Sequence, residues 1–124
     1  MSQRKLTFGQ TLREARIARG HTLRGFAAAV GVSPTYLSQV EQDNVDPPTA
    51  ERVRTMADLL GATPDEWIAL AGRLPEDLPD IIRKQPTAMP ELLRAASGLT
   101  PRQLAELVDR ARALRDERRG GGKA

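Results

Sequence analysis

Hydrogen-bonding side chains crowd one short segment of the chain, SPTYLSQVEQ at residues 33–42. Hydroxyl and amide groups both donate and accept hydrogen bonds, so they suit recognition of a polar partner. The segment is expected to be a short helix, and these side chains are expected on its outward positions: Thr35, Tyr36, Ser38, Gln39 and Gln42. The segment therefore indicates a polar helix held on the surface of a small domain.

Patterns of catalytic or metal-binding residues do not stand out. His21 is the only histidine and the chain has no cysteine, which makes a transition-metal site improbable. There is no Ser-His-Asp set or isolated pair of carboxylates, and the glycines at 120–122 lie in a terminal tail, outside any strand-to-helix turn. We expect no enzyme, no cofactor and no metal.

Capping residues, prolines and glycines predict the helices that position this segment. Ser33 is a typical N-cap and Pro34 a typical first helical residue. The same signals predict helices at Thr7–Arg19, Leu23–Val30, Thr49–Leu60 and Thr63–Ala71, each followed by a glycine, with a loop at Asp43–Pro48. In the first helix, Leu12, Ala15, Ile17 and Ala18 are expected to form the apolar face.

Beyond Gly72, five prolines indicate shorter helices, at residues 76–84, 90–97 and 100–118, followed by a disordered tail at 120–124. The residues expected inside this module are Ile81, Ile82, Met89, Leu92 and Leu93. A narrow apolar seam on the last helix comprises Leu104, Leu107, Ala111 and Leu114. That seam either pairs with a second copy or packs on the two preceding helices.

Composition supports a folded, all-α protein. The 124 residues are 40% hydrophobic, 28% charged and only 3% aromatic, with few β-branched runs. No apolar stretch approaches a membrane span and no secretory signal is evident, so a cytoplasmic location is expected. The net charge of +3 permits a polyanionic partner, and arginines crowd the first quarter of the chain.

A helix-turn-helix requires a small residue where its helices cross, a glycine in the turn, and apolar residues that anchor both helices. These roles fit the following residues in order: Ala27, Gly31, Val32, Leu37 and Val40. From Phe8 to about Gly72 the chain resembles the Cro/cI-type helix-turn-helix family, also called XRE. The resemblance implies a five-helix phage-repressor-like domain at residues 1–72, followed by a helical module at 73–119.

The resemblance also assigns residues 33–42 to the major groove of double-stranded DNA. The expected base-reading residues are Thr35, Tyr36, Ser38 and Gln39, and Gln39 is favoured because an amide can bond adenine N6 and N7 together. The expected phosphate contacts are Thr22, Arg24, Ser33, Gln42, Asn44 and Thr49. Arg16 and Glu41 match the family's structural ion pair. Leu23 departs from the pattern, since family members often have a phosphate-binding glutamine there, and Arg24 is the expected replacement.

Regulators of this type generally bind palindromic operators as dimers, which implies a transcriptional repressor and a homodimer. Some proteins of similar layout act beside a metallopeptidase that inactivates the repressor. The main alternative is an antitoxin-like protein, whose C-terminal helices bind a toxin while the N-terminal domain controls its own operon. A further alternative is a domain that keeps the fold but binds only protein, for which Leu23 is mild support.

Overall fold

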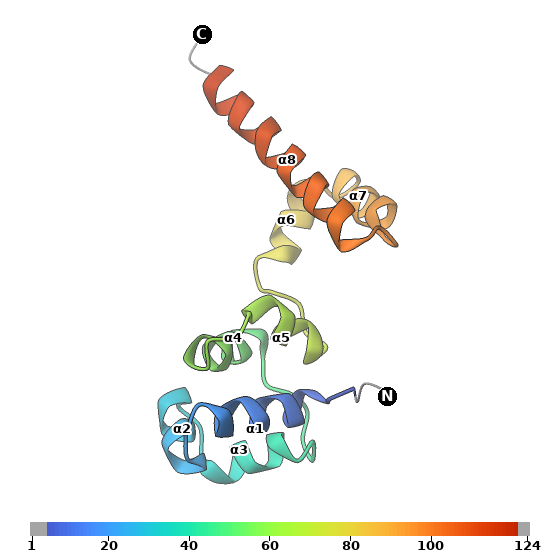
Figure 1. The fold of residues 1–124 in the computed structure, drawn as a ribbon. Helices are drawn as coiled ribbons and strands as arrows, with labels where there is room; N and C mark the ends of the chain where they lie inside the picture. The colour runs from blue at the N-terminus through green and yellow to red at the C-terminus, as the bar shows by residue number, and fades with distance from the viewer. Residues whose placement is uncertain (1–4, 122–124) are drawn as a thin grey trace. The chain divides into compact units, whose positions relative to one another are not determined.

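The computed structural model describes residues 5–121, and this range contains eight helices and no strand (Figure 1). The all-α prediction is confirmed. The helices are α1 (Phe8–Ala18), α2 (Leu23–Val30), α3 (Pro34–Glu41), α4 (Ala50–Leu59), α5 (Pro64–Leu70), α6 (Leu78–Lys84), α7 (Ala88–Ala96) and α8 (Pro101–Gly121). The chain divides into two compact units after Pro79, whereas the sequence predicted the boundary after Gly72.

Side-chain caps begin most helices of the first unit. The hydroxyls of Thr22, Ser33 and Thr49 each accept a hydrogen bond from a first-turn amide of the helix that follows. Thr7 and Gln10 form a reciprocal capping box at the start of α1. Thr63 occupies the N-cap position of α5 with extended backbone, as predicted, but its side chain makes no capping hydrogen bond.

The core of the first unit lies among its five helices. Its largest fully buried side chains are Phe26, Leu12, Leu37, Met56, Ile68, Val40 and Val53. Trp67 meets Phe8 edge to face, with ring centroids 6.1 Å apart. The prediction was wrong for Ala18, which is exposed, and for Ile17, whose side chain is 55% exposed. Five residues separate it from Leu12, which turns it about 140° away from the buried face of α1.

The turn between α2 and α3 has the geometry that its sequence predicted. Gly31 has φ 87°, a left-handed conformation that residues with a Cβ rarely adopt. Its amide and that of Val32 both bond to the carbonyl of Ala27, at 2.9 and 3.0 Å. Ala27 is fully buried, as a residue at the crossing of two helices must be. The two helices therefore form a helix-turn-helix.

The second unit has no core of its own. From Gly72 to Arg119 not one residue is buried, and Leu92 and Leu93 are 51% and 58% exposed. The predicted interior of the module, which also included Ile81, Ile82 and Met89, is therefore wrong. The spacing of apolar residues identifies the apolar face of a helix, but it does not show whether another element buries that face.

Helix boundaries beyond Gly72 differ from the predictions by two or three residues. Helix α6 begins at Leu78 rather than residue 76, α7 begins at Ala88 rather than Pro90, and α8 extends to Gly121. The cap predicted at Thr100 is present, and Gln103 completes a capping box with it. The rest of the predicted disordered tail, residues 122–124, lies outside the described residues. Within residues 5–121, no helix is long and apolar enough to cross a membrane.

Candidate nucleic-acid interface

Four polar side chains form one stripe along α3 and its C-cap. Thr35, Ser38, Gln39 and Gln42 follow one another at spacings of three, one and three residues, which places them on one face of a helix. Thr35 and Gln42 are exposed, and Ser38 and Gln39 are half-buried. The stripe can donate and accept hydrogen bonds over about 10 Å, since a helix rises about 1.5 Å per residue.

Hydrogen bonds order the C-terminal end of this stripe. The Gln42 amide donates to the Ser38 hydroxyl at 2.8 Å, and the Asn44 amide donates weakly to Gln42 Oε1 at 3.4 Å. Gln42, which was predicted to contact phosphate, is therefore continuous with the predicted base-reading residues. Asn44 lies at the edge of the same polar surface.

Tyr36 does not belong to the stripe. Its side chain is half-buried and packs against the hydrophobic core, whereas the sequence predicted an outward position. It follows Thr35 by one residue, a rotation of about 100° around the helix axis. That rotation carries the ring toward the flank of α3, where it packs against the core and anchors the helix.

The predicted pair between α1 and α3 is present and shielded from water. Arg16 Nε lies 2.7 Å from Glu41 Oε2, and Arg16 Nη2 donates to Glu41 Oε1 at 3.0 Å. The side chains are only 10% and 5% exposed. Arg16 Nη1 also donates to the His21 carbonyl at 2.9 Å. This planar fork fixes α3 against α1, because a bidentate arginine pair tolerates little rotation.

Sequence reasoning missed a second tie between α3 and α1. Asp43 has φ 59°, and its carboxylate accepts from the Thr7 hydroxyl at 2.6 Å and from the Gly9 amide at 3.2 Å. A Cβ on Gly9 would lie 2.4 Å from the Val40 carbonyl oxygen. The two backbones therefore approach closely at that point. No local signal marks the tie, because its partners are more than 30 residues apart in the sequence.

A third tie fixes the segment between α3 and α4. The Arg73 guanidinium donates from Nε to the Pro48 carbonyl at 3.1 Å and from Nη2 to the Pro47 carbonyl. Pro48 itself is buried. The loop that leads away from the polar stripe is thus attached to the residue that follows α5.

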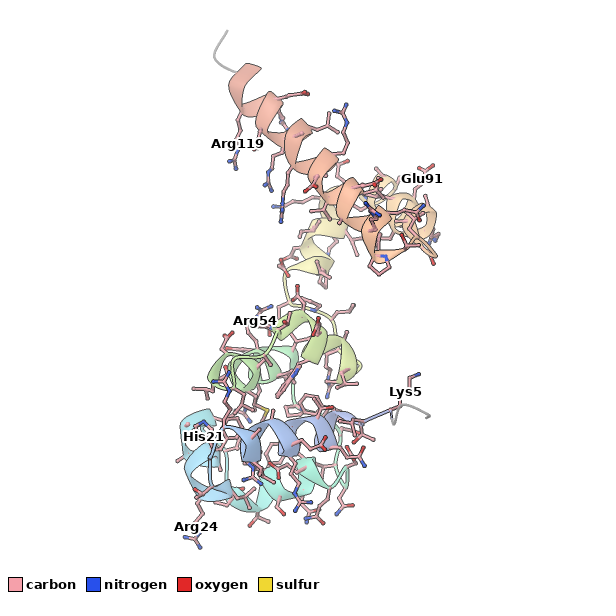
Figure 2. The ribbon with its side chains drawn as sticks, viewed as in Figure 1. Lys5, His21, Arg24, Arg54, Glu91 and Arg119 are labelled. Carbon is pink, nitrogen blue, oxygen red and sulfur yellow. The ribbon has the colours of Figure 1, made fainter. Side chains whose placement is uncertain are left out.

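The predicted phosphate-binding residues flank the stripe. The hydroxyls of Thr22, Ser33 and Thr49 are engaged as helix caps, so the first-turn amides of α2, α3 and α4 are the more direct donors toward an anion. Arg24 is exposed in the first turn of α2 and extends away from the body of the first unit (Figure 2). Arg24 can therefore supply the positive charge that Leu23 lacks.

Leu23 is half-buried against the core and lines a shallow groove of about 250 Å³ with Arg13, Ser38 and Gln42. A leucine here covers apolar surface beside the stripe and cannot bond an anion.

The positive charge of the chain is not concentrated around this surface. Residues 1–79 contain nine Lys and Arg and ten Asp and Glu, whereas residues 80–124 contain ten and six. The surplus of positive charge thus belongs to the second unit. Attraction of a polyanion to the first unit must come from individual groups, chiefly Arg24 and the helix amides.

The predicted apolar seam lies in the second unit, along α8. Its members, Leu104, Leu107, Ala111 and Leu114, line an open groove of about 450 Å³ together with Leu92, Leu93 and Ala96 of α7. The seam therefore lies beside α7, but no residue of α6 lines the groove, so the predicted packing on both preceding helices is not observed. The leucines nevertheless remain 40% to 58% exposed, so α7 does not cover them.

Residues 7–70, more than half of the chain, match the family model described as a helix-turn-helix domain. The chain belongs to the XRE-type helix-turn-helix family. A relative in this family is the uncharacterized HTH-type transcriptional regulator YazB of Bacillus subtilis (strain 168). The two are 36% identical over 59 residues, which cover 48% of this chain and 84% of YazB. The family is one of transcriptional regulators, and the matched part of the chain is the first unit.

Solved structures of XRE-type proteins also resemble the first unit. The biofilm regulator SinR in complex with DNA is 22% identical with a TM-score of 0.46, covering 50% of this chain and 98% of SinR. The clp gene regulator ClgR from C. glutamicum is 34% identical with a TM-score of 0.45, covering 52% of this chain and 83% of ClgR. At TM-scores below 0.5, these likenesses do not bear on the function of this chain.

Proposed function

We propose that the protein is a sequence-specific transcriptional regulator, a repressor, that inserts α3 into the major groove of double-stranded DNA. The observation that carries the proposal is the polar stripe of Thr35, Ser38, Gln39 and Gln42 on the second helix of a helix-turn-helix. The major groove is about 12 Å wide and admits one α-helix with its side chains. The stripe lies on a part of α3 that core contacts do not occupy.

Gln39 is the proposed principal base reader. A side-chain amide matches the donor and acceptor that adenine presents in the major groove, and Ser38 and Thr35 can bond either bases or phosphates. The Arg16–Glu41 fork and the Asp43 tie hold the C-terminal end of α3 against α1. A helix held in this way presents its polar stripe in one orientation, which specific recognition requires.

Phosphate contacts are proposed to orient the protein on the duplex. The donors are the first-turn amides that follow Thr22, Ser33 and Thr49, the Asn44 amide, and the Arg24 guanidinium. Because only one of these groups carries a full charge, we expect one or two counterions to be released per domain. The slope of log affinity against log salt is then about −1 to −2 per domain.

We further propose that two copies bind one operator, on half-sites one helical turn apart. A single domain with so few charged contacts binds weakly, and a second domain on the same DNA multiplies the affinity. A regulator that reads chromosomal DNA would act in the cytoplasm and would not be an enzyme.

A second candidate function is favoured by the exposed leucines of α7 and α8. A unit with no buried residue is expected to find a partner, and an antitoxin-like protein would use this unit to bind a toxin while α3 controls the operon. In that case the protein would be purified with a tightly bound second chain.

The test is binding to DNA from upstream of the protein's own gene, beside a scrambled fragment, across a salt series. The proposal predicts preference for the upstream fragment that persists at physiological salt. Equal binding to both fragments, with the same steep salt dependence, would leave only a non-specific basic surface. No binding to either would favour the protein-binding alternative.

A further inference from the structure

The groove between α7 and α8 is an apolar surface that the described residues leave uncovered. It is lined by Leu92 and Leu93 of α7 and by the seam of α8, and Leu107, at its middle, is 42% exposed. Contiguous exposed leucines of this kind mark interaction sites in soluble proteins. The groove lies wholly within the second unit, so an inference about it does not rest on DNA binding.

The length of the groove fits a helix. From Leu104 to Leu114 the seam spans ten residues, or about 15 Å at 1.5 Å per residue. That length corresponds to nearly three helical turns. An amphipathic helix that docks in such a groove inserts apolar residues at spacings of three and four, which matches the spacing of the leucines on α8.

Arginines outnumber acidic residues of α8 at the edge of the groove. Arg110 lines the groove itself. Arg115 lies seven residues after Val108 and Arg118 seven after Ala111, so both continue the apolar face toward the end of α8. Asp109 and Asp116 fall on the opposite side of the helix, whereas Glu106 and Glu117, four residues before and seven after Arg110, lie on the same edge as Arg110. A partner in the groove therefore meets Arg115 and Arg118 along the continued apolar face, and Arg110 with its acidic neighbours at the other edge.

This arrangement disfavours a second copy as the occupant. If two α8 helices paired in parallel through the seam, Arg110 of one copy would face Arg115 of the other. If they paired antiparallel about the middle of the seam, Arg110 would face its own equivalent. Each arrangement places arginines of the two copies beside one another at the edge of the interface. Because like charges repel, the dimer would be less stable.

We propose that the α7–α8 groove binds an acidic amphipathic helix of another protein. Leucine or isoleucine side chains of that helix fill the space between Leu93, Leu104 and Leu107, and its flanking Asp and Glu pair with Arg110 and Arg115. The partner thus buries the leucines that the second unit exposes and neutralises part of its positive surplus.

The test uses the full chain and two synthetic helical peptides of about 20 residues. Both carry leucine at every a and d position, and they differ only in having Glu or Lys at every flanking e and g position. Binding is measured by fluorescence anisotropy. We expect the acidic peptide to bind about tenfold more tightly, as two exposed ion pairs at the edge of an apolar contact allow.

Variants of the arginines locate the site. Arg110→Glu with Arg115→Glu should reverse the preference between the two peptides. Arg94→Glu with Arg102→Glu changes the charge by the same amount outside the groove and should leave the preference unchanged. Leu107→Asp should abolish binding of the acidic peptide, while urea unfolding followed by Trp67 fluorescence verifies that the first unit remains folded.

Equal affinity for both peptides, or an unchanged preference in the Arg110 and Arg115 variant, would overturn the proposal. Sedimentation equilibrium supplies the other decisive outcome. Three results together would show that a second copy occupies the groove and that the proposal is wrong. They are that the native protein is a dimer, that Leu107→Asp is a monomer, and that the acidic peptide does not bind the native protein.

Discussion

Substitution Glu41→Ala removes the partner of a guanidinium that is almost completely shielded from water. Arg16 keeps its charge in the variant, because arginine stays protonated throughout the accessible pH range. In the native protein the hydrogen bond from Arg16 to Glu41 raises the pKa of Arg16 further above its ordinary value. The variant must therefore either hold an unpaired cation inside the first unit or move α3 to let water in.

The expected cost follows from the burial of the pair. Breaking a buried ion pair costs about 3–5 kcal/mol, and side-chain exposures of 10% and 5% leave little solvent to reduce it. A unit of roughly 75 residues is stable by about 4–11 kcal/mol. Glu41→Ala should therefore bring the first unit close to its unfolding threshold.

Urea unfolding measures this cost directly, because Trp67 is the only tryptophan and is buried in the first unit. With a slope of about 1 kcal/mol per molar urea, the midpoint should fall by about 3–5 M. Glu76→Ala removes an exposed glutamate and should change the free energy of unfolding by less than about 0.5 kcal/mol. The double variant Arg16→Met with Glu41→Leu leaves no unpaired charge and should stay within about 1.5 kcal/mol of the native protein.

A midpoint shift below about 1 M for Glu41→Ala would refute the reasoning, since the pair would then be no stronger than a surface salt bridge. A double variant as unstable as the single one would refute it as well, because the loss could not come from an unpaired charge.

Two further predictions concern the first unit. Gly9→Ala places a Cβ against the Val40 carbonyl and should destabilise the unit by about 1–3 kcal/mol in urea unfolding, whereas Gly25→Ala, which meets only the Thr22 hydroxyl and no backbone atom, should cost less. A small effect of Gly9→Ala would mean that α1 can shift without cost. Arg24→Ala should reduce the salt slope of DNA binding by about 1 per domain, and Arg83→Ala in the second unit should not. Equal slopes for both variants would exclude Arg24 as a phosphate contact.

Local signals account for the parts of the fold that the sequence predicted well. A capping hydroxyl accepts a hydrogen bond from an amide three residues away, and a glycine with positive φ determines the conformation of its own turn. Ser33 therefore predicts the start of α3, and Gly31 predicts the end of α2. The Arg16–Glu41 pair was also predicted, but from the resemblance to a family. The residues alone do not indicate that positions 25 apart in the chain meet.

Features that depend on tertiary packing could not be predicted. The Asp43 carboxylate reaches Thr7 only because α1 and α3 lie side by side, and Tyr36 turns inward because the core leaves space beside α3. In the second unit the apolar periodicity of α8 was recognised correctly, yet its leucines are exposed. The same apolar periodicity occurs on a helix face that is buried within the protein and on a face that stays exposed until a partner binds.

The central claim is that Gln39 reads a base in the major groove, and a chemical double-mutant cycle tests it most directly. Within the protected operator, each adenine is replaced in turn by 7-deazaadenine, which lacks the N7 acceptor. For one adenine, the account predicts that the native protein and a Gln85→Ala control lose about 1–3 kcal/mol of binding free energy, while Gln39→Ala loses nothing further. Equal losses for the native protein and Gln39→Ala at every adenine would contradict the claim.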